Sequence, residues 1–173
     1  MLDIGCGIMP QNYLRPTVHI CCEPFAQYLE VLRQKTRDKT DRIYALVRAS
    51  WKEALVLFPA GSVDSVFVCD VIEHLEKEEG LRLLEKTVPL ARKQVVLFTP
   101  LGFMPQNHPT GKDAWGLDGG QWQEHKSGWD LGDFDDRWRL VVSEAFHATD
   151  NTGKRLEKPF GAFWAIYNNN AMR

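Results

Sequence analysis

The feature that most constrains the fold of this chain is an alternation of short apolar runs with amphipathic segments. Residues 63–69 (VDSVFVC) and 94–99 (QVVLFT) are almost continuously apolar, which is typical of strands buried on both faces. Between them, residues 75–91 repeat apolar side chains at helical spacing. The apolar side chains of both kinds of segment are buried when helices cover the two faces of a parallel sheet. Because the crossover connections between parallel strands are right-handed, such a sheet is doubly wound.

The N-terminal part of the chain continues the same alternation. Residues 2–4 form a short apolar run before a glycine-rich turn, and residues 18–22 form a second run that ends at Glu23. Residues 25–32 then repeat apolar side chains at helical spacing, and residues 44–47 form a further brief strand. We therefore expect three more strands and one more helix before the strand at 63–69.

The pattern changes after the strand at 94–99. Residues 100–129 are rich in Gly, Pro, Asn, Asp and Trp without periodicity, which predicts a long loop, and loops of this length are usually functional or disordered. Residues 138–146 and 161–167 are strand candidates separated by a turn at 150–153, which favours an antiparallel hairpin. The sequence thus predicts an α/β, doubly wound, Rossmann-like fold, with a mostly parallel sheet and an antiparallel C-terminal edge hairpin.

Length and composition fit one globular domain. The chain has 173 residues, with 44% hydrophobic and 25% charged residues, and we expect a single domain over residues 1–173. Only Met1 and Leu2 precede the first motif, so the first strand is expected to be truncated at the N-terminus. The net charge of −2 argues against nucleic acid as a partner.

Neither a membrane nor an oxidising compartment is indicated. No stretch approaches the roughly 18 apolar residues of a membrane span, and the N-terminus does not resemble a signal peptide. None of the cysteines forms a C-x-x-C pair, which predicts reduced thiols in a cytoplasmic protein. We expect no metal site. The cysteines are Cys6, Cys21, Cys22 and Cys69.

The sequence DIGCG at residues 3–7 ends the first strand. Glycines at a strand end permit a tight turn and close approach of a ligand, and ligands of open α/β sheets bind at the carboxyl ends of the strands. Pro10 replaces the third glycine of a dinucleotide fingerprint, which opposes a pyrophosphate ligand. The carboxylate of Asp3 favours a cationic ligand instead, unless it caps its own turn.

Two further acidic residues follow strand ends. Glu23 comes 16 residues after Gly7, where an acidic side chain can accept both hydroxyl groups of a ribose. Glu23 does not distinguish NAD from S-adenosylmethionine, and it could also serve only as a charge at a helix N-terminus. Asp70 directly follows the strand at 63–69 and adds negative potential where a cationic cofactor would lie.

Together, residues 2–7 (LDIGCG), Glu23 and residues 70–75 (DVIEHL) resemble the class I S-adenosylmethionine-dependent methyltransferases, and most closely the small bacterial methyltransferase domains. Residues 161–166 (GAFWAI) are similar to the last strand of that group, so the resemblance spans nearly the whole chain. It implies a methyltransferase domain with S-adenosylmethionine as its cofactor and a small-molecule acceptor. The oligomeric state stays open.

The resemblance also implies a role for each matching position on the first two strands. Asp3, Gly5 and Gly7 would surround the methionine part of the cofactor, and Glu23 would hold the ribose. We expect the three carboxylates of Asp3, Glu23 and Asp70 to open into one cleft above the two glycines.

The third and fourth strands would supply the remaining cofactor contacts. Asp70 and Val71 would close over the cofactor from the fourth strand. After the third strand, the family often contacts adenine through an acidic residue. This chain has Ser50 at that position, and Trp51 could pack on the base instead.

The implied reaction is an in-line displacement at a sulfonium, for which the protein mainly aligns the reactants. A general base is needed only when the acceptor must lose a proton, and we select His125 as the candidate catalytic base. The loop at 100–129 follows the fifth strand, so it should cover the cofactor and exclude water. Residues 102–106 and 125–129 resemble segments of methyltransferases of sugar and polysaccharide biosynthesis, which suggests a sugar or another small molecule as acceptor.

Two other functions are compatible with parts of the sequence. The short N-terminus is compatible with a catalytically inactive module that binds S-adenosylmethionine. An NAD-dependent oxidoreductase would use the same ribose contact, but Pro10 and the additional carboxylates oppose it. Stabilisation by S-adenosylmethionine, S-adenosylhomocysteine or NAD would separate the cofactor classes.

Overall fold

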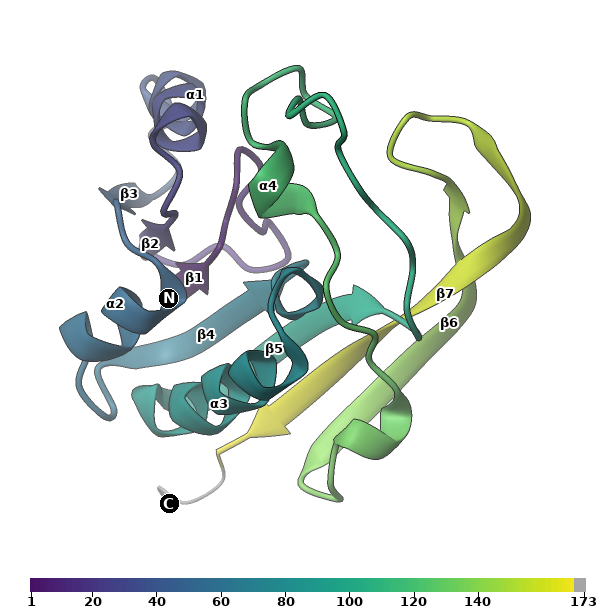
Figure 1. Cartoon of the computed structure of the whole chain (residues 1–173). Coiled ribbons are helices and arrows are strands. Elements are labelled where there is room, and N and C mark those ends of the chain that lie inside the picture. Colours follow the sequence, from purple (N-terminus) through teal and green to yellow (C-terminus); the bar gives the residue numbers. More distant parts are fainter. Residues whose placement is uncertain (170–173) are drawn as a thin grey trace.

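A seven-stranded sheet with the order β3-β2-β1-β4-β5-β7-β6 forms the centre of the computed structural model, which describes residues 1–169 (Figure 1). Strands β1 to β5 are parallel, and β7 is antiparallel to both β5 and β6. The predicted doubly wound, mostly parallel sheet with an antiparallel C-terminal pair is therefore confirmed. The strands are β1 (Leu2–Ile4), β2 (Val18–Cys22), β3 (Ile43–Val47), β4 (Val63–Cys69), β5 (Ala91–Pro100), β6 (Trp138–Thr149) and β7 (Arg155–Asn168).

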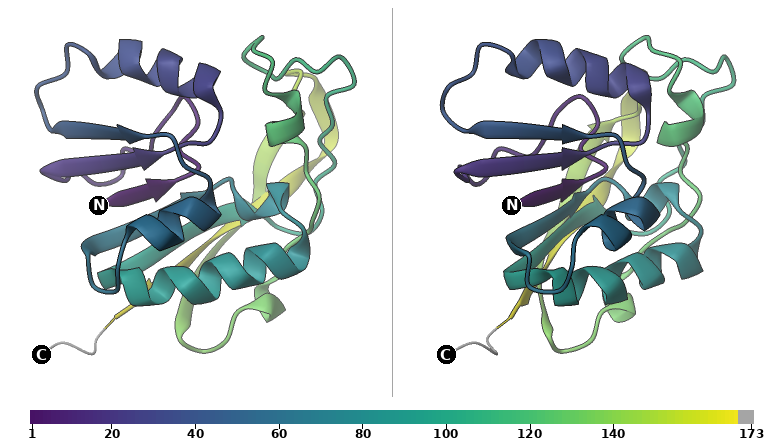
Figure 2. Two further views of the ribbon diagram at one scale, coloured as in Figure 1. Left: turned by 60° about the vertical axis from the view of Figure 1, so that its left-hand side comes forward. Right: turned by 90° about the vertical axis from the view of Figure 1, so that its left-hand side faces the viewer.

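Helix α1 (Ala26–Thr36) lies on one face of the sheet, and α2 (Trp51–Leu57) and α3 (Lys77–Thr87) lie on the other (Figure 2). The helix predicted over residues 75–91 is shorter than expected. It ends at Thr87 because Pro89 cannot donate a backbone hydrogen bond and clashes with the preceding turn, so the chain continues as the 3₁₀ turn η2 (Val88–Leu90). Two further 3₁₀ turns are η1 (Ile72–His74) and η3 (Leu131–Asp133).

The main core lies between the sheet and the pair α2 and α3. Val66, Val68 and Leu97, which belong to the apolar runs of β4 and β5, are completely buried there. Trp129 is also completely buried in this core, although it follows the long loop. A Cβ atom on Gly80 of α3 would lie only 2.4 Å from the Trp129 ring, which explains why a glycine interrupts the helical pattern.

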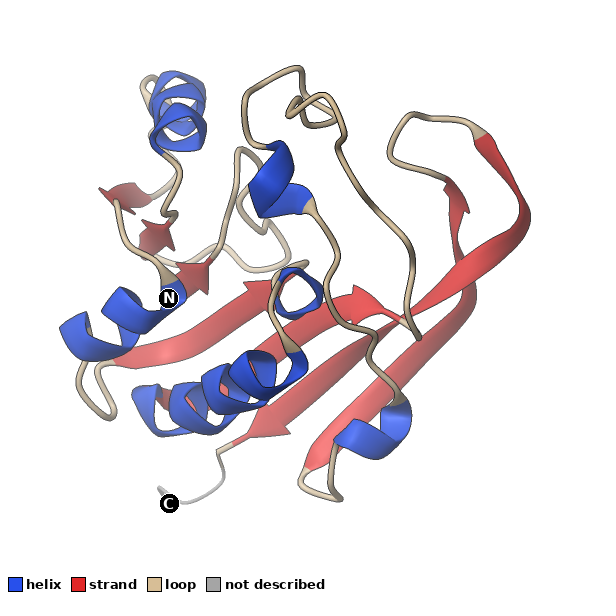
Figure 3. Cartoon of the chain, viewed as in Figure 1, coloured by secondary structure: helices blue, strands red, loops and turns tan. Residues whose placement is uncertain are grey.

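The segment between β5 and β6 passes over the carboxyl ends of the parallel strands (Figures 1 and 3). Residues 101–119 form a loop, as predicted, whereas α4 (Gly120–Gln123) was not expected from the sequence. A backbone bridge between Gly102 and Trp129 closes the base of this segment. Within the described residues, no helix is long and apolar enough to cross a membrane.

Candidate functional site

Two adjoining cavities open at the carboxyl ends of β1, β2 and β4. The first cavity lies beside Glu23 and Trp51 and has a volume of 310 Å³, and the second cavity lies beside His125 and has a volume of 270 Å³. The two cavities share part of their lining, so they form one continuous cleft. The shared residues are Gly5, Asp70, His74 and Gln123.

The turn after β1 forms the floor of this cleft. Gly5 and Gly7 have positive φ angles of 68° and 54°, a conformation that L side chains rarely adopt. The Gly5 N–H donates to the carbonyl oxygen of Cys22 over 2.8 Å, which fixes the turn to the end of β2. A Cβ atom on Gly5 would lie 2.7 Å from Val71 Cγ2, so only glycine leaves room between β1 and the segment after β4.

Glu23 connects the two motifs at the ends of β1 and β2. Its carboxylate accepts hydrogen bonds from the Gly7 N–H (3.0 Å) and from the Phe25 N–H (2.9 Å). Burial raises the pKa of Glu23, and these two hydrogen bonds oppose that shift. Because each carboxylate oxygen has a second lone pair, Glu23 can still accept hydroxyl groups from a ligand in the first cavity.

Asp70 lines both cavities from the end of β4. Within the described residues, it is the only non-glycine residue with a positive φ angle, which is 52°. The Asp70 N–H donates to the Phe98 carbonyl oxygen over 2.9 Å and so holds this conformation against β5. Backbone strain of this kind often marks a functional site, and here it directs a carboxylate into the cleft.

Asp3 does not line either cavity, in contrast to the expectation of three carboxylates in one cleft. Ile4 lines the first cavity, and side chains alternate along a strand, so Asp3 points to the opposite face of the sheet. There Asp3 Oδ2 accepts a hydrogen bond from the Gln11 N–H (2.9 Å) and lies 3.0 Å from His19 Nε2. Asp3 therefore stabilises the segment that follows the glycine turn and does not face the ligand cleft.

The first cavity brings together most of the other residues proposed for the cofactor. Ser50, Trp51 and Val71 all line it. Ser50 is also the N-cap of α2, where its side chain and Glu53 form a capping box. Trp122 of α4 also lines the first cavity and was not predicted as a cofactor contact, because a tryptophan in a long loop carries no local signal for its position.

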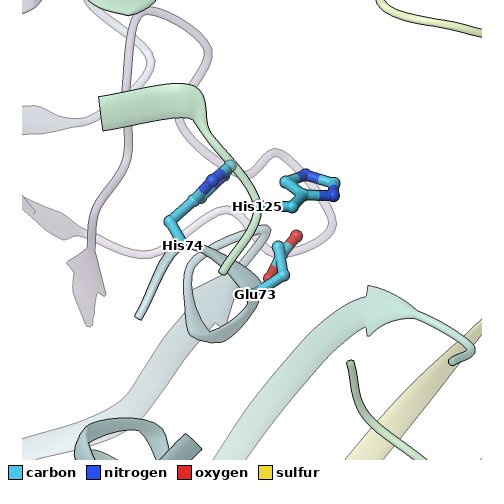
Figure 4. Close-up of side chains that lie close together, drawn as sticks. All are labelled: Glu73, His74 and His125. Atoms are coloured by element: carbon cyan, nitrogen blue, oxygen red, sulfur yellow. The ribbon is translucent and has the colours of Figure 1, made fainter. Parts of the chain in front are cut away.

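The second cavity contains the predicted base, His125, together with two residues that sequence reasoning did not select, Glu73 and His74. Figure 4 shows Glu73 and His74 extending from η1 and His125 extending from the segment after α4. The two imidazole rings have centroids 4.9 Å apart. Both Glu73 and His74 belong to the DVIEHL motif, in which only Asp70 and Val71 were predicted to contact the cofactor.

Hydrogen bonds to η1 keep this arrangement in place. The N–H groups of Lys126 and Ser127 donate to the Glu73 carbonyl oxygen over 2.7 and 3.1 Å. The Glu73 side chain is buried, and burial raises its pKa well above the usual range. Burial lowers the pKa of His125, which favours a neutral imidazole.

No known family model matches the sequence, and no curated protein matches it either. Among solved structures, the chain is similar to an S-adenosylmethionine-dependent methyltransferase from Methanosarcina mazei. The identity is 14%, the match covers 97% of this chain and 91% of that chain, and the TM-score is 0.67.

Two other solved structures show the same similarity. One is a magnesium protoporphyrin IX methyltransferase (ChlM) from Synechocystis with bound S-adenosylmethionine, at 12% identity, 96% and 68% coverage, and a TM-score of 0.58. The other is an S-adenosylmethionine-dependent methyltransferase from Archaeoglobus fulgidus, at 15% identity, 97% and 85% coverage, and a TM-score of 0.59. The chain therefore has the fold of the class I S-adenosylmethionine-dependent methyltransferases.

Proposed function

We propose that this protein is a methyltransferase that uses S-adenosylmethionine as its cofactor and methylates a small-molecule acceptor. The observation that carries the proposal is the position of two carboxylates, Glu23 and Asp70, in one cavity on either side of the Gly5 turn. A carboxylate at the end of β2 suits a ribose, and a second carboxylate suits a ligand with positive charge. S-adenosylmethionine has both features, whereas the pyrophosphate of NAD would be repelled.

In this proposal, each part of the first cavity has a role toward the cofactor. Glu23 accepts the ribose hydroxyl groups, and Asp70 faces the charged methionine part beside Gly5, where the first cavity meets the second cavity and its Gly7. Asp3 contributes indirectly, because its hydrogen bond to Gln11 supports the same turn.

The adenine would lie on the other side of the first cavity. Ser50, Trp51 and Val71 surround this position, and the Trp51 ring offers an apolar surface on which a base can pack. The similarity to ChlM, whose solved structure contains S-adenosylmethionine, supports this assignment of the cofactor.

The acceptor would occupy the second cavity, next to the methyl group. The cofactor supplies an activated methyl group, so the protein has to orient the acceptor and exclude water. The volume of the second cavity, 270 Å³, suits a small molecule such as a sugar. His125 is the proposed base, because its Nδ1 is held by the Met104 carbonyl oxygen (2.6 Å) and its Nε2 remains available to take a proton.

Calorimetric titration with S-adenosylhomocysteine and NAD tests the cofactor. We expect binding of S-adenosylhomocysteine and no binding of NAD. Glu23→Gln and Asp70→Asn should each weaken the binding of S-adenosylhomocysteine by about 5- to 150-fold, which corresponds to the loss of about 1–3 kcal/mol from a charge-assisted hydrogen bond. Glu30→Gln, on the exposed surface of α1, is the matched control and should have no effect. Unchanged affinity in both cavity variants would contradict the assignment.

A screen of acceptors with a labelled methyl donor tests the activity itself. Transfer of label to small molecules of a cell extract is the expected result. Binding of S-adenosylhomocysteine without transfer to any acceptor would favour the inactive binding module instead.

A further inference from the structure

Three side chains with metal-binding chemistry meet in the second cavity. Glu73, His74 and His125 each offer one ligand atom, and these atoms all lie within 4.8 Å of one another. The first two residues belong to η1, and the third follows α4, so the fold brings together groups about 50 residues apart (Figure 4). This cluster was not expected from the sequence, which predicted no metal site.

The hydrogen bonds of the two imidazole rings prepare them as ligands. His74 Nδ1 lies 3.1 Å from the Glu124 carbonyl oxygen, and His125 Nδ1 lies 2.6 Å from the Met104 carbonyl oxygen. A carbonyl oxygen can only accept, so Nδ1 carries the proton in each ring. The Nε2 atom then keeps its lone pair, and a backbone carbonyl on the other ring nitrogen is the usual support of a metal-binding histidine.

The side chain of Glu73 is also held in place and offers one oxygen to a ligand. Its side chain is only 2% exposed, and its Oε2 accepts a hydrogen bond from the Thr99 hydroxyl over 3.0 Å. Its Oε1 is buried and accepts no hydrogen bond from an N–H or hydroxyl donor within residues 1–169, and the carboxyl group of Asp70 is a close neighbour of this side chain. Burial and the neighbouring Asp70 favour the protonated form of Glu73 when the cavity is empty, and a cation would replace that proton and give the buried oxygen a partner.

We infer that Glu73, His74 and His125 bind a divalent transition-metal ion, with Zn²⁺ as the best match. Two imidazole nitrogens and one carboxylate oxygen form a donor set typical of catalytic zinc sites, whereas Mg²⁺ and Ca²⁺ prefer oxygen ligands. Ligand atoms about 2.1 Å from a tetrahedral ion are roughly 3.4 Å apart. Small side-chain rotations would therefore close the cluster around the ion.

Such an ion would act on the acceptor in the second cavity. Three protein ligands leave a coordination position open, and an acceptor hydroxyl group bound there would release its proton to water more readily. When the ion is bound, His125 is a ligand and not a free base. The role of the ion in catalysis rests on the proposed function, whereas the binding of the ion is tested independently of it.

Titration of chelator-treated protein with Co²⁺, followed by absorption, and with Zn²⁺, followed by calorimetry, tests the site. One ion should bind per chain, without a thiolate charge-transfer band and without competition from excess Mg²⁺. His74→Ala, His125→Ala and Glu73→Gln should each lower the affinity at least about tenfold. His108→Ala removes a histidine outside the cluster and should leave the affinity unchanged.

Four results would overturn the inference: no saturable binding of either ion, a thiolate band, unchanged affinity in all three cluster variants, or an equal loss in His108→Ala. Titration of S-adenosylhomocysteine into the same preparations separates this inference from the proposed function. If S-adenosylhomocysteine binds and the ions do not, the proposed function stands and the metal site falls. If the ions bind and S-adenosylhomocysteine does not, the metal site stands and the proposed function falls.

Methyl transfer then distinguishes the two roles of His125. With an ion as the activating group, metal-free protein should be inactive and regain activity with Zn²⁺, and His74→Ala should stay inactive at Zn²⁺ concentrations that restore the wild-type protein. If His125 acts as a free base, metal-free protein should keep its activity and only His125→Ala should lose it, by roughly 100-fold or more.

Discussion

The Tyr28 hydroxyl group donates a hydrogen bond to Asp113 Oδ2 over 2.6 Å and thereby joins α1 to the loop that covers the cleft. Asp113 is buried, and its Oδ1 accepts from the N–H groups of Trp115 and Leu117, each over 2.9 Å. Trp115 in turn lines the second cavity. The position of the loop at the cleft therefore depends on a contact with a helix that lies far away in the sequence.

Tyr28→Phe should loosen this loop while the sheet stays intact. The substitution leaves Asp113 Oδ2 without its donor, at a cost of about 1–3 kcal/mol to the local structure. We expect faster hydrogen exchange in residues 111–120 and no change in β4 and β5. Tyr13→Phe is the matched control, because Tyr13 is exposed and packs edge-on against Trp164. Equal exchange in Tyr28→Phe and the wild-type protein would show that the loop is held by other contacts.

Gly80→Ala should destabilise the protein although alanine is the better helix former. The added methyl group would meet Trp129 at 2.4 Å in a fully buried part of the core. Overpacking costs about 1–3 kcal/mol, which exceeds the helix-propensity gain of about 1 kcal/mol. Urea denaturation should therefore show a lower free energy of unfolding. Gly132→Ala has no neighbour within 4 Å of the new methyl group and should be close to neutral, and a similar loss in both variants would contradict the role of Trp129.

The buried pair of Asp3 and His19 should make stability depend on pH. Burial alone lowers the pKa of His19, but hydrogen bonds with Asp3 and Cys21 outweigh it and raise the pKa to about 9. The ordinary pKa of histidine is about 6.5, so the pair stabilises the folded state fully below that pH. The stabilisation is lost as the pH rises toward 9, because the folded protein must then release the proton.

The comparison of wild-type protein with Asp3→Asn measures this effect. The advantage of the wild-type protein in unfolding free energy should decrease by about 2–3 kcal/mol between pH 6.5 and 9. Tyr44, which stacks on His19, is present in both proteins. The comparison is made in a Cys21→Ala background, because the pKa of Cys21, about 6, itself depends on His19 and Asp3. A difference that is independent of pH would show that His19 is neutral in the folded state.

Much of the fold and part of the site follow from local properties of the chain. The apolar runs of β4 and β5 and the helical spacing of α1 predict their elements because burial selects the period of a strand or a helix directly. The turn at Gly5 and the acidic residues Glu23 and Asp70 could be found for a similar reason, since each lies at the end of a predicted strand. Helix α2 was missed because its seven residues are too few for a clear period.

The sequence by itself thus determined the order of the strands and the two longer helices along the chain, and the edge of the sheet where the cleft opens, because both depend on short-range patterns. Only the tertiary structure decided where individual side chains point. Asp3 faces His19 because the pairing of β1 with β2 and the alternation along β1 turn it away from the cleft. Glu73, His74 and His125 meet because Trp129 and Ser127 anchor the returning loop on η1, and such a contact between distant segments leaves no periodic trace in the sequence.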